Sequence, residues 1–397
     1  MSQRTLKVAF VVGEESGDVL AADLLSALRS KYDGGVSAIG VGGPKLQALG
    51  LNTLFDPHEI ALFGISSVIA KLPRLVWLIR ATAASIITEN PDCLIIVDSP
   101  DFTHRVAKRV RAARPDIPII NYVCPSVWAW RQGRAKAMRA YVDEVLAIMP
   151  FEPDILKDLD GPAATYVGHR LASDALILSA FEAQSAIELD RFADWKRPIR
   201  LLCLPGSRRG EIERHMGVMG ETLADMHQRG RKIQALMHTP PNHETRVRKL
   251  AKDWAVKPQI STDMAGKAAA FSTADAALAA SGTVTLELAL AGIPTVAIYK
   301  LDPIMRLFRR HVKIWTASLP GLIADQAIVP EIFDEMIRPG KLARELEKLA
   351  RPGPARDTQL QGFELVRERM HTETPSGELA ARRVLALIDR KLAKSGA

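Results

Sequence analysis

Three short stretches of the sequence carry residue types whose spacing could do chemistry. The first, Ser281-Gly282-Thr283, follows an apolar run of strand length, Ala276 to Ala279, and opens a helical pattern. A tight turn of small residues leaves the first N–H groups of such a helix unpaired, where they and the helix dipole can hold a phosphate. Glu287 lies one helical turn after Thr283, and its carboxylate could accept two hydrogen bonds from a ribose diol. A glycine-punctuated strand–helix repeat with a solvent-facing glutamate would give the same pattern.

The second stretch is Gly206-Ser207-Arg208, which lies between an apolar run at Ile199 to Leu204 and a helical pattern that opens at Glu211. Small residues let the backbone approach a phosphate closely, and Arg208 can supply a forked, permanently charged donor. A solvated arginine is the alternative interpretation. Together the first two stretches predict a nucleotide site in the second half of the chain.

The third candidate is Asp98, which ends the apolar run Cys93 to Val97. Open α/β sheets bind their ligands outside the carboxyl ends of their strands, and a carboxylate there can act as a general base. Asp101 fits better as a cap of the following helix. The pattern therefore favours Asp98 as the residue that takes a proton.

Other polar and aromatic residues follow apolar runs and could line the same site. They are Ser16, Asp18, Asp101, Trp128, Trp130, Arg131 and His169. Ser16 and Asp18 are most simply helix caps, and His169 could be a packed loop residue. Two tryptophans and an arginine in one loop are unusual, because loops seldom carry so much apolar area unless it is buried or used.

The elements that must position these residues alternate along the chain. Apolar runs of strand length alternate with helical patterns, which predicts an α/β fold of two doubly wound, Rossmann-like domains. A chain of 397 residues is also too long for one ordinary core. We expect an N-terminal domain at 1–170, a connector at 171–198, a C-terminal domain at 199–355 and closing helices at 356–397.

Charge and cysteine content narrow the class of function. The formal charge of +8 favours an anionic partner, which could be nucleic acid, a phosphorylated substrate or an acidic membrane surface. The 3 cysteines are isolated in apolar runs, so we expect neither disulfides nor a zinc site, and a reduced cytosolic setting fits. Asp158-Leu159-Asp160 is most simply a solvated turn before Gly161-Pro162. We therefore expect no metal and no cofactor.

Two segments mix apolar and basic residues. The segment Ile60 to Arg80 is apolar on most faces, but Lys71, Pro73 and Arg74 in its interior argue against a bilayer span. The segment Pro303 to Trp315 is the densest basic amphipathic stretch in the chain. Core packing would explain much of the first segment, and a membrane-facing or acyl-chain-binding surface is the alternative. A solvated helix face would explain the second segment, and a membrane contact or an interface is the alternative.

The order of the motifs is typical of one family. From the first strand to about residue 335 the chain resembles the lipid-A-disaccharide synthases, and PSVWAWR is the most specific of the shared motifs. The motifs are Gly13-Glu14 with Ser16-Gly17-Asp18, Asp98 to Phe102, Pro125 to Arg131 (PSVWAWR), Pro150 to Glu152, Gly168-His169, Pro205 to Arg208, Ala280 to Thr283 with Glu287, and Val329 to Glu331.

The resemblance implies a fold and a reaction. The fold would be the glycosyltransferase-B architecture, in which two domains face each other across the active-site cleft. The reaction would join UDP-2,3-diacylglucosamine to 2,3-diacylglucosamine 1-phosphate (lipid X), with inversion and without a required metal, to give the β-1,6-linked lipid A disaccharide 1-phosphate and UDP. The enzyme would lie peripherally on the cytosolic face of the anionic inner membrane, could form a homodimer and would not bind nucleic acid.

One position departs from the family pattern, and two other function classes remain open. Family members commonly have Asn where this chain has Gly321, so we do not assign that residue to the site. A UDP-sugar epimerase of the same fold would need only one sugar and would not explain the apolar and basic segments. A non-enzymatic lipid or nucleic-acid binder would explain the charge but not two phosphate-type loops.

Overall fold

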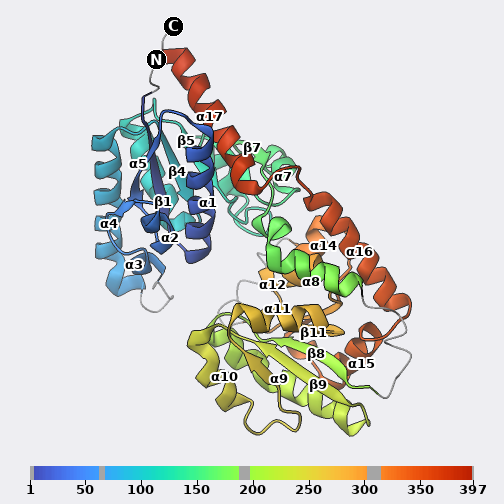
Figure 1. The fold of residues 1–397 in the computed structure, drawn as a ribbon. Coiled ribbons are helices and arrows are strands. Elements are labelled where there is room, and N and C mark those ends of the chain that lie inside the picture. The colour runs from blue at the N-terminus through green and yellow to red at the C-terminus, as the bar shows by residue number, and fades with distance from the viewer. Residues whose placement is uncertain (1–3, 62–67, 187–196, 302–313, 396–397) are drawn as a thin grey trace. The chain divides into compact units, whose positions relative to one another are not determined.

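The computed structural model describes residues 4–61, 68–186, 197–301 and 314–395. The chain divides into two compact units (Figure 1). Unit 1 comprises Met1–Arg170 together with Thr372–Ala397, and unit 2 comprises Leu171–His371. The C-terminal end of the chain therefore returns to the unit in which the chain begins.

Unit 1 is built on a sheet of seven parallel strands in the order β3-β2-β1-β4-β5-β6-β7. The strands are β1 (Leu6–Val12), β2 (Val36–Val41), β3 (Asn52–Thr53), β4 (Cys93–Val97), β5 (Ile119–Tyr122), β6 (Glu144–Ala147) and β7 (Ala163–Tyr166). Apolar, β-branched runs such as CLIIV in β4 suit strands that are covered on both faces. The chain winds outward from β1 in one direction and from β4 in the other, so β1 and β4 are neighbours at a topological switch point.

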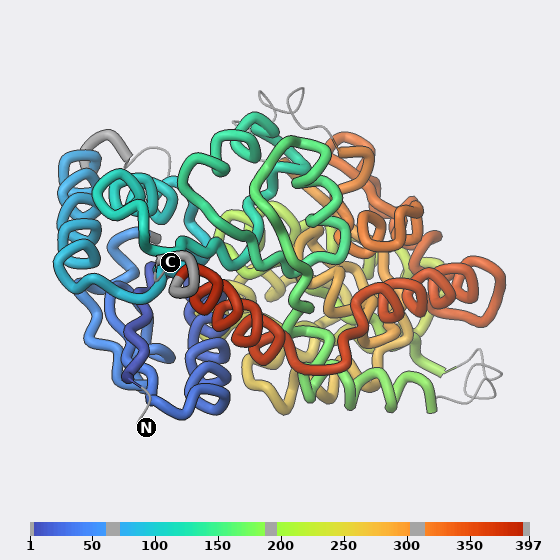
Figure 2. Tube along the Cα trace, turned by 90° about the horizontal axis from the view of Figure 1, so that it is seen from above, coloured from blue at the N-terminus to red at the C-terminus, as the bar shows by residue number. Residues whose placement is uncertain are grey.

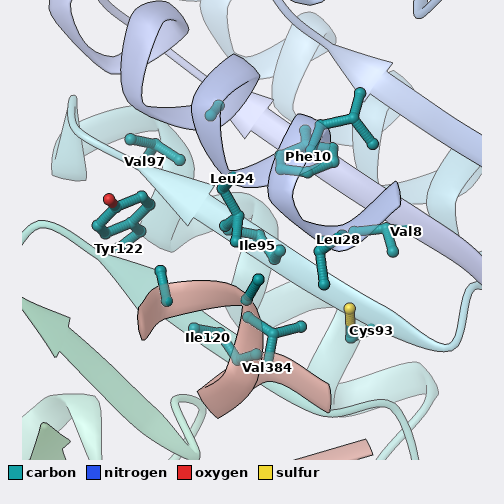
Figure 3. Close-up of a cluster of buried hydrophobic side chains, with 14 of the residues drawn as sticks. Val8, Phe10, Leu24, Leu28, Cys93, Ile95, Val97, Ile120, Tyr122 and Val384 are labelled. Atoms are coloured by element: carbon teal, nitrogen blue, oxygen red, sulfur yellow. The ribbon is translucent and has the colours of Figure 1, made fainter. Parts of the chain in front are cut away.

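Helices cover both faces of this sheet. They are α1 (Glu15–Lys31), α2 (Pro44–Ala48), α3 (His58–Ala61), α4 (Val68–Glu89), α5 (Pro100–Ala113), α6 (Gly133–Met138), α7 (Glu152–Asp158) and α17 (Ser376–Ser395), with a 3-10 turn at η1 (Arg170–Ser173) beginning at the end of the unit. Alternate residues of β1 point to opposite faces, as the strand period requires. Val8 and Phe10 pack with α1 and α17, whereas Ala9 and Val11 pack with α4 and α5. Figure 3 shows the first of these two cores, with Val384 of α17 among the strand residues.

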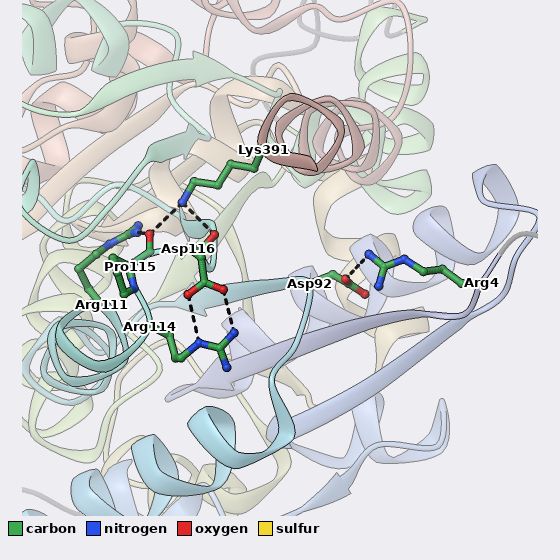
Figure 4. Close-up of polar contacts among 7 residues, drawn as sticks. All are labelled: Arg4, Asp92, Arg111, Arg114, Pro115, Asp116 and Lys391. Atoms are coloured by element: carbon green, nitrogen blue, oxygen red, sulfur yellow. Dashed lines mark hydrogen bonds and ion pairs between the residues drawn. The ribbon is translucent and has the colours of Figure 1, made fainter. Parts of the chain in front are cut away.

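Helix α17 belongs to unit 1 by polar contacts as well as apolar ones. The guanidinium of Arg383 pairs with Glu144 of β6, which is 2% exposed. Near the other end of the helix, Lys391 donates to the carbonyls of Pro115 at 3.3 Å and of Asp116 at 3.2 Å (Figure 4). In Figure 2 the red C-terminal helix lies against the blue elements of the same unit.

Unit 2 repeats the design with six parallel strands in the order β10-β9-β8-β11-β12-β13. The strands are β8 (Ile199–Leu204), β9 (Ile233–His238), β10 (Gln259–Ser261), β11 (Ala276–Ala280), β12 (Thr295–Tyr299) and β13 (Glu331–Phe333). The switch point lies between β8 and β11, which pair in parallel.

The helices of unit 2 bury their apolar faces on this sheet. They are α8 (Ala175–Ser185), α9 (Arg209–Gln228), α10 (Glu244–Leu250), α11 (Met264–Thr273), α12 (Thr283–Leu290), α14 (Leu319–Ala324), α15 (Pro339–Leu349) and α16 (Pro354–Met370), with 3-10 turns at η3 (Pro241–His243) and η5 (Asp334–Met336). Helices α9 and α15 share one core with β8, β9, β11 and β12. Gln359 of α16 is buried and bonds both the N–H and the carbonyl of Thr295, which fixes α16 to β12.

The expected strands occur in the described residues with small shifts at their ends. Helix α1 begins at Glu15, directly after the short loop that follows β1. The two closing helices belong to different units, since α16 packs in unit 2 and α17 packs in unit 1. Residues 62–67 of the segment Ile60 to Arg80, and all of Pro303 to Trp315 except its last two residues, lie outside the described residues.

Candidate active site

The switch point of unit 1 brings the loop after β1 next to the loop after β4. Val12 and Val97 are partners in the parallel pair, and the N–H of Gly13 donates to the carbonyl of Val97 at 3.4 Å. Immediately after Val97, Asp98 has φ of 54° and Ser99 has φ of 40°. Non-glycine residues adopt this left-handed backbone rarely and at a cost of about 1 to 3 kcal/mol each. Strain of this kind, concentrated in one loop, is typical of a functional site.

The carboxylate of Asp98 lies in a confined space against α1. The hydroxyl of Ser16 donates to Oδ2 of Asp98 at 3.5 Å. A Cβ at Gly17 would come within 2.7 Å of the same oxygen, so only glycine leaves room for this carboxylate. The pKa of Asp98 is raised to about 6, mainly by burial and also by the nearby charge of Glu14, against the opposing effect of the Ser16 hydrogen bond. A carboxylate with this pKa is ionised at neutral pH and is still basic enough to accept a proton.

Asp18 has a structural role as a helix cap. Its carboxylate accepts hydrogen bonds from the backbone N–H groups of Gly43 and Lys45, each at 2.8 Å, and of Leu46 at 3.3 Å. It therefore caps α2. The expectation that Asp18 is a helix cap is confirmed, although the helix it caps is α2. The expectation that Ser16 is a cap is wrong, because Glu14 is the N-cap of α1 and no side-chain hydrogen bond caps that helix.

Asp101 is a different case from Asp98. Its side chain is 75% exposed and lies 3.1 Å from Arg134 and 4.0 Å from Arg131. The expectation that it caps the following helix is wrong, since Ser99 is the N-cap of α5 and no side-chain hydrogen bond caps that helix. Asp101 sits in the first helical turn, where a negative charge suits the helix dipole, and balances two arginines.

The PSVWAWR loop is anchored by a buried glutamate, Glu152, which was not among the predicted site residues. Trp128 donates its indole N–H to Glu152 at 3.4 Å and packs edge-on against Phe151. Glu152 also accepts from the backbone N–H groups of Ile148 at 3.1 Å and Met149 at 3.0 Å. Burial raises the pKa of Glu152 to about 7, and these hydrogen bonds oppose the shift.

The other two predicted residues of this loop face outward. Trp130 is 46% exposed, and the guanidinium carbon of Arg131 lies 4.3 Å from the centre of its ring. The cation–π contact keeps both side chains together at the surface. Trp128 is thus an anchor, whereas the side chains of Trp130 and Arg131 are exposed to solvent.

His169 follows β7 at the end of the same sheet edge. Its pKa is lowered to about 4, mainly by burial and also by the charge of Arg170. Its imidazole is therefore neutral at physiological pH. Gly168 precedes it with φ of 83°, a conformation that favours glycine.

In unit 2 the loop after β11 leads directly into α12. Ser281 continues the pairing of β11 with β12, since its N–H donates to the carbonyl of Ile298 at 2.9 Å. Gly282 is the N-cap of α12, and no side-chain hydrogen bond caps the helix. Gly282 and Thr283 are exposed. No side chain therefore occupies the start of this helix, where backbone N–H groups of a helix can hold a phosphate.

The loop after β8 differs from the loop after β11. Oε2 of Glu211 accepts from the N–H groups of Ser207 at 3.2 Å and Arg208 at 3.3 Å. The guanidinium of Arg208 also lies 3.4 Å from Glu211, although its side chain is 80% exposed. Gly206 has φ of 115°, and a Cβ there would collide with Glu211. Glu211 thus shapes this loop and caps α9, and its spacing of three residues from Arg208 is a signal that sequence reasoning missed.

The side chain of Glu287 forms an ion pair with a lysine. Oε2 of Glu287 lies 2.6 Å from the ammonium of Lys267 in α11, and the two side chains are 18% and 19% exposed. Sequence reasoning missed Lys267, because it belongs to a different helix and no local pattern joins it to Glu287.

A buried histidine joins two loops of unit 2. The N–H of Lys300, after β12, donates to Nε2 of His215 at 3.2 Å. Since Nε2 accepts, Nδ1 carries the proton and donates to the carbonyl of Pro205, after β8, at 2.9 Å. Burial lowers the pKa of His215, which keeps it neutral in this role. Its position in the middle of α9 gave no sequence signal for this contact.

Gly321 lies in the first turn of α14. Ser318 caps this helix by accepting from the N–H of Gly321 at 3.3 Å. A Cβ at Gly321 would lie 3.1 Å from Oγ1 of Thr316 and 3.2 Å from the carbonyl of Gln326. The position is therefore tightly packed, and this chain has no side-chain contact to offer from it.

Within the described ranges, no group of three or more His, Cys, Asp or Glu side chains could hold a metal ion. None of the described helices is both long and apolar enough to cross a membrane.

The family assignment rests on the whole chain and not on single motifs. The family model for lipid-A-disaccharide synthetase matches residues 8–379. The chain belongs to the lipid-A-disaccharide synthetase family. The predicted resemblance is thereby confirmed, and with it the prediction that this is an enzyme of a glycosyltransferase family.

Individual members of the lipid-A-disaccharide synthetase family match this chain over nearly their full lengths. The lipid-A-disaccharide synthase of Nitrobacter winogradskyi is 44% identical over 378 residues, which cover 94% of each chain. The lipid-A-disaccharide synthase of Bradyrhizobium diazoefficiens is 41% identical over 386 residues, which cover 97% of each chain.

Solved structures resemble the fold at low sequence identity. A UDP-GlcNAc 2-epimerase from Neisseria meningitidis, solved with UDP-GlcNAc bound, has a TM-score of 0.59 at 12% identity and covers 97% of this chain and 100% of its own. The MurG protein of Acinetobacter baumannii has a TM-score of 0.56 at 16% identity and covers 98% of this chain and 100% of its own. These likenesses concern the fold alone, and they confirm the predicted class of two Rossmann-like domains of glycosyltransferase-B type.

Proposed function

We propose that the protein is a lipid-A-disaccharide synthase that transfers the sugar of UDP-2,3-diacylglucosamine to the 6-hydroxyl of 2,3-diacylglucosamine 1-phosphate. The observation that carries this proposal is the family match over residues 8–379. The products are the β-1,6-linked disaccharide 1-phosphate and UDP. The epimerase alternative has only fold-level support, since its structural relative is 12% identical.

Unit 2 is the proposed UDP site. The start of α12 offers exposed N–H groups that no side chain caps, which supports pyrophosphate binding at Ser281 to Thr283. Glu287, one turn further along the helix, is the proposed acceptor of the ribose hydroxyls. Gly206 to Arg208 are the second phosphate contact, and the exposed guanidinium of Arg208 is free enough to turn from Glu211 toward the nucleotide.

Asp98 is the proposed general base. The acceptor oxygen forms a bond to the anomeric carbon while the bond from that carbon to the UDP oxygen breaks, and the proton of the acceptor hydroxyl passes to Asp98. Attack from the face opposite UDP inverts the anomeric centre. The burial that raises the pKa of Asp98 to about 6 supports this role. Arg208 and the α12 helix start hold the charge that develops on UDP.

Three rivals for the base are less suited. Asp101 is exposed, and its carboxylate is already engaged with two arginines. His169 is neutral, but its pKa of about 4 makes it a weaker base than Asp98. The hydroxyl of Ser16 donates a hydrogen bond to Asp98 and so supports that carboxylate. With Asp18, Trp128, Trp130 and Arg131, these residues remain proposed neighbours of the acceptor.

Peripheral binding to the anionic cytosolic face of the inner membrane is proposed through α4. Leu72 is 45% exposed and Trp77 is 56% exposed, although Leu78 and Ile79 on the other side of the helix are buried. The guanidinium of Arg74 lies 4.5 Å from the centre of the Trp77 ring. A tryptophan beside an arginine on an exposed apolar face suits an interface where acyl chains meet anionic headgroups. A homodimer also remains a proposal.

The reaction is tested by incubating the protein with the two acylated sugars and following both products. A disaccharide 1-phosphate formed together with equimolar UDP is the expected result. Conversion of the UDP-sugar alone to an isomer would identify an epimerase. Binding without any product would identify a non-enzymatic lipid binder.

A further inference from the structure

We propose that Lys267 is a positioning residue that holds Glu287 ready for the ribose of the nucleotide. The inference rests on the proposed role of Glu287 in UDP binding. Lys267 lies in the first half of α11, and Glu287 lies one turn inside α12. Neither the phosphate-type loops nor the family motifs include Lys267.

The contact engages only one oxygen of the carboxylate. The Lys267 ammonium lies 2.6 Å from Oε2 of Glu287. Among the described residues, none donates a hydrogen bond to Oε1. The ion pair therefore orients the side chain through one oxygen and leaves the other to accept hydrogen bonds from a ligand.

Burial makes the pair more than a surface contact. The two side chains are 19% and 18% exposed, so solvent screens them only partly. The ammonium also lies 5.2 Å from the centre of the Phe271 ring, which restrains the lysine from its own helix. A carboxylate that is already held in one orientation loses less side-chain freedom when it binds a ligand.

Lys267 also neutralises the negative charge of Glu287. Glu287 is only four residues from the start of α12, where the pyrophosphate is proposed to bind. An unpaired carboxylate so close to a nucleoside diphosphate would repel it. The ammonium of Lys267 neutralises that charge while the carboxylate keeps its capacity to accept hydrogen bonds.

The test separates this role from direct phosphate binding by comparing two ligands. Affinities for UDP and for 2′,3′-dideoxy-UDP are measured by calorimetry on the full chain and on Lys267→Met, Lys267→Arg and Glu287→Ala. Lys348→Met is the matched control, because Lys348 pairs with Glu345 on the exposed face of α15. Thermal melting of each variant checks its folding.

The expected result is a larger loss for the ligand that has the ribose hydroxyls. Lys267→Met should weaken UDP binding about ten-fold, because hydrogen bonds to a charged group are lost or misdirected. The affinity for 2′,3′-dideoxy-UDP should fall less, because that ligand is affected only by the carboxylate charge that Lys267 no longer neutralises, and Lys267→Arg should recover part of the UDP affinity. In a Glu287→Ala background, Lys267→Met should weaken UDP binding no further.

Two outcomes would overturn the inference. An equal loss for both ligands would mean that Lys267 contacts the phosphates or only supports the fold, and no loss for either would mean that Glu287 needs no positioning. Failure of the underlying ribose assignment has a different signature. In that case Glu287→Ala itself would keep the wild-type preference for UDP over the dideoxy ligand.

Discussion

The hydroxyl of Ser16 lies 3.5 Å from Oδ2 of Asp98, so the first turn of α1 supports the carboxylate that follows β4. The two residues are 82 positions apart in the chain and meet because β1 and β4 are neighbours at the switch point. A hydrogen bond to the ionised carboxylate stabilises the form that a general base needs.

The pH dependence of the reaction should report this contact. Since the pKa of Asp98 is raised to about 6, kcat/KM should rise with pH through about 6 and level off above it. Ser16→Ala removes the hydrogen bond that lowers the pKa, so its acidic limb should move to higher pH. Profiles measured with both substrates check this, and an unchanged limb, or one moved to lower pH, would mean that Ser16 does not act on the ionisation of the base.

Removal of Glu287 should weaken nucleotide binding. Glu287→Ala deletes the proposed acceptor of the ribose hydroxyls, so the free energy of UDP binding should fall by about 1.5 to 3 kcal/mol, as expected for hydrogen bonds to a charged group. Calorimetry measures the change. Glu345→Ala, which removes a glutamate from an exposed lysine pair, is the matched control. Unchanged UDP affinity in Glu287→Ala would remove this residue from the site.

The anchor of α17 should contribute to the stability of unit 1. Arg383→Ala leaves Glu144, which is 2% exposed, with only the hydroxyl of Thr165 as a side-chain donor among the described residues. We expect a loss of about 2 kcal/mol in the free energy of unfolding, since a buried charge without its counter-ion is costly. Denaturant unfolding checks it against Arg390→Ala, an exposed arginine of the same helix. Equal stability of the two variants would contradict the anchoring role.

Membrane binding should depend on both charge and Trp77. Because contact would combine apolar burial with attraction to anionic lipid, the protein should sediment with acidic vesicles and be partly released by salt. Trp77→Ala should bind less, since its ring is 56% exposed and available for burial. The control is Met336→Ala, which removes an exposed apolar side chain from unit 2. Trp254→Ala would be unsuitable, because that tryptophan packs against a core. Equal partitioning onto neutral and acidic vesicles at low salt would refute the electrostatic part.

Much of the fold follows from local pattern. Continuous apolar runs such as Leu6–Val12 and Cys93–Val97 are strands because a parallel sheet buries both faces, and their ends locate the loops where ligands bind. The order of the strands also places Asp98 at a switch point. Short edge strands such as β3 and β10 lack enough residues for a recognisable period, and only pairing with a neighbour defines them.

The parts of the site that sequence did not predict depend on contacts between distant residues. Asp18 caps α2 through residues 25 to 28 positions away, and Lys267 reaches Glu287 from another helix 20 positions earlier. No local spacing encodes such contacts. Glu211 is the exception, because its distance of three residues from Arg208 matches a known capping pattern.

The most direct test of this account is the turnover of Asp98→Asn with both acylated sugars at saturation. Loss of a general base typically slows a reaction about a hundred- to ten-thousand-fold, so turnover should fall by that order. UDP affinity and thermal stability should stay close to those of the wild type, because the substitution preserves the size of the side chain. If Asp98→Asn keeps most of its turnover while Asp101→Asn or His169→Ala loses it, Asp98 is not the base and one of those neighbours is.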